Sequence, residues 1–130
     1  IFDPLYRRRL VYLLVIGETA TVTVGDGKLY FFVPRELNNM VLIAVHAGVV
    51  TASTSGLPTI QLYNVTDSVD ILSTGVTIDI NERTSYTAAT QPVINTANDD
   101  LATGDLLRVD VDVAGTGTKG LQVWITAKRI

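Results

Sequence analysis

The chain has 130 residues, of which 47% are hydrophobic and 18% charged, and its formal net charge is −3. This length fits one domain, and the hydrophobic share excludes an intrinsically disordered chain. The lack of cysteine excludes disulfides, cysteine-ligated zinc and thiol nucleophiles, the single histidine excludes poly-histidine metal sites, and the acidic balance argues against general nucleic-acid binding.

The N-terminal segment combines a basic cluster, Arg7, Arg8 and Arg9, with a following run of apolar residues at 10–16. This order superficially matches a secretory signal peptide. The run is far shorter than the ~20 apolar residues of a transmembrane helix, and it continues into TATVTV, which alternates as strands do. We therefore expect an extended N-terminal arm over residues 1–9 and a single domain over residues 10–130 that begins with a buried strand.

The next segments read as strands separated by turns. Residues 19–24 and 28–33 flank Gly-Asp-Gly at 25–27, which predicts a hairpin turn, and residues 34–39 predict a turn or one short helical turn. Residues 40–51 form the longest apolar stretch, with Val41, Ile43 and Val45 on one face and Met40, Leu42 and His46 on the other. Because both faces are apolar, we expect this strand to be covered on both sides.

The second half of the chain predicts shorter strands and one long pair. Short strands are expected at 59–65, 69–72 and 76–80, followed by a polar connection over 81–104 with a possible strand at 92–94. Residues 105–113 and 121–128 flank a glycine-rich turn and predict a terminal hairpin, with apolar partners that include Val111 opposite Val123 and Val109 opposite Ile125. Eight or nine short strands at this spacing indicate an all-β antiparallel sandwich, jelly-roll-like.

No catalytic, metal or cofactor site is expected. His46 lacks an orienting carboxylate nearby in sequence and is interpreted as a packed or interface histidine. The carboxylates around residues 99–112 match no calcium loop, so we expect them to cap turns or to line a solvated face, as for Asp110 and Asp112. The glycine-rich segments at 25–27 and 115–120 lead into no helix and are interpreted as hairpin turns rather than phosphate loops.

The surplus of apolar strand faces predicts association. Residues 10–16 and 40–50 each offer two apolar faces, more than one sandwich core of this size needs. Hiding about 600 Å² of apolar surface contributes about 15 kcal/mol before the cost of association. We expect a homo-oligomer, with a trimer favoured. The expected interface residues are Phe2, Tyr6, Arg7, Arg8, Arg9, Met40, Leu42, His46 and Trp124, the last either an exposed anchor or covered by the arm.

Three quarters of the chain resembles a known class of proteins. The segments are PRELNNMVLIAVHAGVVTASTSGLPTIQLYNVTD, TIDIN and NDDLATGDLLRVDVDVAGTGTKGLQVWI, spanning about residues 33–127. They resemble small β-sandwich structural proteins of tailed bacteriophage virions, of the head decoration (cement) type or the tail-associated type. The resemblance implies a role in the virion and carries no catalytic residue; residues 1–32 lie outside it.

The favoured hypothesis is a non-enzymatic capsid decoration protein on the phage head, bound to the major capsid protein or other virion proteins, with no membrane and no specific nucleic acid as partner. The alternative is a tail or fibre module that binds host surface glycans through Trp124, Tyr63 and Tyr86, with polar contacts from loops 52–58 and 81–104. An enzyme such as a glycosidase would need two carboxylates across a cleft, and nothing in the sequence pairs the three glutamates, Glu18, Glu36 and Glu82.

Overall fold

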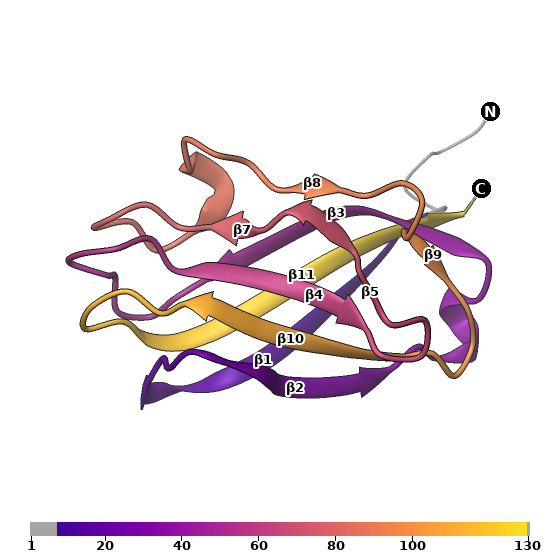
Figure 1. Ribbon diagram of the computed structural model, residues 1–130, viewed down its shortest axis with the longest axis horizontal. Coiled ribbons are helices and arrows are strands. Elements are labelled where there is room, and N and C mark those ends of the chain that lie inside the picture. Colours follow the sequence, from indigo (N-terminus) through magenta and orange to yellow (C-terminus); the bar gives the residue numbers. More distant parts are fainter. Residues whose placement is uncertain (1–7, 130) are drawn as a thin grey trace.

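Two antiparallel sheets pack face to face in the structure, a computed structural model that describes residues 8–129 (Figure 1). Sheet A contains, in spatial order, β1 (Arg8–Thr21), β11 (Lys119–Arg129), β3 (Met40–Gly48) and β9 (Asp100–Leu101). Sheet B contains β2 (Gly25–Phe32), β10 (Leu106–Val113), β4 (Thr59–Asn64) and β5 (Val69–Asp70), with β7 (Val76–Thr77) also paired to β4.

The remaining elements are short. β6 (Leu72–Thr74) pairs with β8 (Val93–Ile94), and the described part of the chain also contains the 3-10 turns η2 (Arg35–Leu37) and η3 (Ser85–Thr87). The predicted all-β antiparallel sandwich is confirmed, with eleven strands among residues 8–129 instead of eight or nine, because the connections contain strands of two or three residues. Both sheets interleave strands from the two ends of the chain. The jelly roll stays a prediction, which this interleaving favours.

The core lies between the sheets and is built from one face of each long strand. On β10 and β11 the residues that the alternation assigned to the apolar face are buried, except Val113, which is 42% exposed and lies beyond a register shift after Val111. The buried ones are Leu107, Val109, Val111, Leu121, Val123, Ile125 and Ala127. Alternation therefore predicted the inward face of β11, and of β10 as far as Val111.

The predicted terminal hairpin is wrong. β10 pairs with β2 and β4 in sheet B, while β11 pairs with β1 and β3 in sheet A. The apolar residues of the two strands thus meet across the core and not side by side. The predicted hairpin at residues 25–27 is wrong for the same reason, since β1 and β2 also lie in opposite sheets and residues 25–27 begin β2. In each case the connection crosses between sheets.

A β-bulge interrupts the alternation of side chains between the two faces predicted for residues 40–51. On β11, Thr126 lies opposite Ala44 and Ala127 lies opposite Leu42, so Ile43 is an extra residue that reverses the alternation. Met40 and Leu42, expected at an interface, are instead core residues with 1% and 2% exposure. Beyond the bulge, His46 lies opposite Trp124 and away from the core cluster, as expected.

β1 begins at Arg8, so Arg8 and Arg9 belong to a strand that pairs with the C-terminal strand, where the arm was expected to reach residue 9. Phe2, Tyr6 and Arg7, also expected at an interface, lie outside the described residues. Within residues 8–129, no helix is long and apolar enough to cross a membrane.

Candidate functional site on the outer face of sheet A

The outer face of sheet A carries exposed apolar side chains along β1. Leu10, Tyr12 and Leu14 alternate on this face, and they are 57%, 61% and 63% exposed. Their neighbours Val11 and Leu13 point toward the core, where Leu13 is buried and Val11 packs against the core cluster. β1 therefore has one apolar face in the core and a second apolar face on the surface.

β1 is also an edge strand. Its partner is β11, and no other strand of the described chain pairs with it. The pairing is regular from Arg8 opposite Lys128 to Leu14 opposite Gln122, and it continues to Thr21 with register shifts after Leu14 and after Ile16. Edge strands that are long and apolar tend to pair with another chain. We call Leu10, Tyr12 and Leu14 on this strand the β1 edge patch.

A cluster of aromatic rings continues the patch across sheet A. The rings of Tyr12 and Trp124 stack with centroids 5.4 Å apart, and the Trp124 indole Nε1–H donates a 2.8 Å hydrogen bond to the Tyr86 hydroxyl. His46 lies under Tyr86, with ring centroids 4.5 Å apart. Trp124 is consequently only 9% exposed, and Tyr12 and Tyr86 contribute to its cover. Of the two alternatives for Trp124, the exposed anchor is wrong, because Tyr12 of β1 and Tyr86 of η3 cover the indole.

His46 makes a hydrogen bond that the sequence did not predict. The Ser85 hydroxyl lies 3.0 Å from His46 Nδ1 and accepts the backbone N–H of Ala47 at 3.0 Å. The hydroxyl has one proton and two acceptor lone pairs, so it can pair with Nδ1 in either imidazole tautomer while it accepts the Ala47 N–H. Ser85 is fully buried, so this serine–histidine pair fixes η3 onto β3 and does not present a hydroxyl to a substrate.

Burial lowers the pKa of His46 below its ordinary value of 6.5. The folded protein then binds this proton more weakly than the unfolded chain, so the stability contributed by neutral His46 is complete above about pH 6.5 and is lost as the pH falls below it. We expect wild-type protein to lose more unfolding free energy between pH 7.5 and pH 5 than the His46→Gln variant, measured by urea denaturation. His46 is the single histidine, so equal losses in the two proteins would contradict this assignment.

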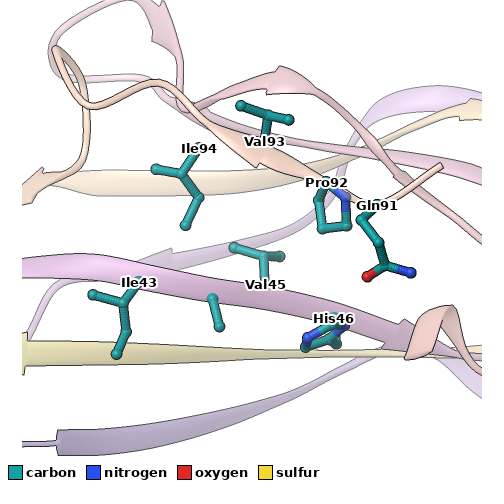
Figure 2. A pocket seen from close by; sticks show the side chains of 8 residues that line it. Ile43, Val45, His46, Gln91, Pro92, Val93 and Ile94 are labelled. Atoms are coloured by element: carbon teal, nitrogen blue, oxygen red, sulfur yellow. The ribbon is translucent and has the colours of Figure 1, made fainter. Parts of the chain in front are cut away.

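Two open hollows flank the aromatic cluster. The larger, about 350 Å³, lies between β3 and the segment that includes β8; Figure 2 shows Val45 pointing toward that segment and Ile43 pointing away from it. The smaller, about 220 Å³, lies beside Tyr12 and Trp124 and is bordered by the polar side chains of Arg83, Thr84 and Gln122. Ligand pockets usually measure about 300–1,000 Å³, so the larger hollow lies near the lower limit of this range and the smaller one lies below it.

The outer face of sheet B has a different chemistry. Arg108 lies over the Tyr63 ring at 4.1 Å from its centroid and donates from Nε to Asp110 at 2.8 Å, which raises the pKa of Arg108. Asp110 also accepts the backbone N–H of Gly27 at 2.8 Å and is buried, so the solvated position predicted for it is wrong.

Tyr30 and Phe32 of the edge strand β2 are 53% and 68% exposed and form a second apolar patch.

The structure brings together some of the predicted site residues. His46, Trp124 and Tyr86 are in contact, while Tyr63 lies on the opposite sheet. The sequence analysis did not name Leu10, Tyr12 and Leu14 as a site. It did find two apolar faces in residues 10–16, and the exposed face of these two is the β1 edge patch. Among residues 8–129, no group of three or more histidine, cysteine, aspartate or glutamate side chains is placed to hold a metal ion.

Comparison with known proteins finds no matching family model, no matching curated protein and no matching solved structure.

Proposed function

We propose that this chain is a non-enzymatic structural protein of a tailed-bacteriophage virion, a capsid decoration protein that oligomerises and stabilises the head. The observation that carries the proposal is the exposed apolar surface of the two edge strands. Leu10, Tyr12 and Leu14 on β1 are each more than half exposed, as are Tyr30 and Phe32 on β2. Monomers rarely leave such patches uncovered, so they favour association with other chains.

The two patches suit a protein with two kinds of neighbour. The β1 edge patch lies on sheet A, and the pair on β2 lies on sheet B, so one surface can contact a copy of the chain while the other contacts a shell protein. The choice of a phage head as that shell rests on the resemblance of residues 33–127 to virion proteins.

Cryo-electron microscopy of virions from the phage that encodes this chain tests the proposal. We expect density for the sandwich on the outside of the head, and heads lacking the protein to lose their contents at lower temperature than decorated heads. Adding back the purified protein should restore the thermal resistance, while a Phe32→Asp variant should restore less of it. Density confined to the tail, or the absence of the protein from virions, would refute the head assignment.

A glycan-binding tail module is the second candidate. It is favoured by the exposed Tyr12 and Tyr86 rings, and by the polar side chains that border the hollow beside Tyr12. Because Trp124 is covered, the informative variant is Tyr12→Ala, with Tyr63→Ala on the opposite sheet as its control. Glycan-array binding that Tyr12→Ala abolishes and Tyr63→Ala leaves intact would favour this role over the first.

A further inference from the structure

We propose that β1 of one copy pairs antiparallel with β1 of a second copy, which joins two A sheets into one continuous sheet across a two-fold axis. The inference rests on the proposed assembly role and specifies the partner of the β1 edge patch. It follows from the edge itself, from the side chains on it, and from the charges at its two ends.

The regular part of the β1 edge, residues 10–14, lacks the features by which proteins protect edge strands, and the two irregularities of β1 lie beyond it, between Leu14 and Ile16 and between Ile16 and Thr21. Natural edges are short, bulged, or carry lysine or proline. The other outer strands fit this description: β9 and β5 have two residues each, and β2 begins with Gly25, Asp26, Gly27 and Lys28. β1 has fourteen residues, and its segment 10–14 contains no charge, no proline and no register shift.

The side chains of β1 favour a partner with an identical apolar face. If β1 were extended by another strand, Leu10, Tyr12 and Leu14 would gain cross-strand neighbours on the outer face. With a two-fold axis near Leu13, Tyr12 of each copy lies opposite Leu14 of the other and Leu10 lies near Ile16, so apolar residues lie opposite apolar residues along this segment. A two-fold axis makes this contact closed and self-complementary, which limits the assembly to two chains at this edge.

The charges at the ends of β1 favour the antiparallel direction. Arg8 lies five positions before Leu13 and Glu18 lies five positions after it, since 13 − 8 = 18 − 13. A two-fold axis near Leu13 places Arg8 of each copy near Glu18 of the other, and Tyr12 opposite Leu14. Glu18 lies beyond the register shift between Leu14 and Ile16 and within the one between Ile16 and Thr21, so this ion pair requires the long Arg8 side chain to bridge a displacement of one residue or more. Parallel pairing would instead place like charges together.

Sedimentation and native mass spectrometry of the full chain test the pairing. We expect wild-type protein at twice the 14.0 kDa chain mass, about 28 kDa. Leu14→Asp should give a folded monomer, as judged by circular dichroism, because a carboxylate would lie in the apolar pairing face. Leu57→Asp, at an exposed leucine in a loop far from β1 in sequence, is the matched control and should stay dimeric.

A charge exchange tests the direction. Arg8→Glu and Glu18→Arg should each weaken dimerisation roughly tenfold at low salt, because each dimer contains two such pairs. The double variant should recover wild-type affinity. A double variant no tighter than either single variant would overturn the antiparallel register.

The outcomes separate this inference from the proposed function. A protein that decorates heads but is a monomer or a trimer in solution refutes the β1 pairing and leaves the decoration role standing. A β1 edge cross-linked to a capsid-protein strand, without a dimer, also refutes it. A β1-paired dimer that is absent from virion heads refutes the decoration role and supports the pairing.

Discussion

Replacing Trp124 with alanine is expected to lower the free energy of unfolding by about 3 kcal/mol. The indole is 9% exposed, stacks on Tyr12, and donates its N–H to the Tyr86 hydroxyl. Alanine would leave a void under both tyrosines and remove the partner of that hydroxyl. Urea denaturation at a fixed protein concentration measures the change, since self-association also contributes to stability.

A milder pair of variants separates packing from hydrogen bonding at this site. Trp124→Phe keeps an aromatic ring but removes the hydrogen-bond donor, and Tyr86→Phe keeps the ring but removes the acceptor. Each variant should therefore lower the free energy of unfolding by about 1 kcal/mol. The double variant should cost less than the sum, because the same hydrogen bond is lost in both. If Trp124→Ala lowered the free energy of unfolding by less than Trp124→Phe does, the packing assigned to the indole would be contradicted.

Gly120→Ala is expected to destabilise the fold by about 3 kcal/mol, while Gly117→Ala should cost only about 1 kcal/mol. Both glycines have positive φ, +70° and +73°, so alanine is strained at either position. At Gly120 the added Cβ would also lie 2.9 Å from Val50 Cγ2 and 3.0 Å from Glu18 Cα, whereas at Gly117 nothing lies within 4 Å. Glu18 Cα belongs to the backbone of β1 and cannot yield as a flexible side chain can.

Thermal unfolding of the two glycine variants checks this difference. Equal midpoints for Gly120→Ala and Gly117→Ala would show that the close approach of β1 to residue 120 does not resist an added methyl group. Because the backbone φ is nearly the same at the two sites, the comparison isolates the steric contribution.

The strands were predictable to the extent that their side chains alternate. Residues 40–51, 59–65 and 105–113 were predicted as strands, and the structure has strands over most of each range: β3, β4 and β10. The inward faces of β11, and of β10 as far as Val111, were predicted for the same reason. Alternation fails at Ile43, where one extra residue moves Met40 and Leu42 into the core, because a bulge leaves no mark in hydrophobic periodicity.

The candidate site depended more on contacts distant in sequence. His46 and Trp124 were named from their residue types, but Ser85 and Tyr86 reach them from the polar connection 81–104, where the sequence gives no periodic signal. Asp110 was expected in solvent because it alternates with apolar residues, yet the N–H of Gly27 and the guanidinium of Arg108 satisfy it in a buried position.

By itself, the sequence determined that the chain is an all-β domain with more apolar strand surface than its core can hold, because side-chain alternation is a local property of each strand. Only the tertiary structure decided which strands pair. A glycine-rich connection can close a hairpin within one sheet or cross between two sheets with the same inward face, so periodicity cannot distinguish them. The crossing at residues 114–118 places β11 next to β1, and it is this pairing that leaves β1 at the edge of sheet A with Leu10, Tyr12 and Leu14 exposed.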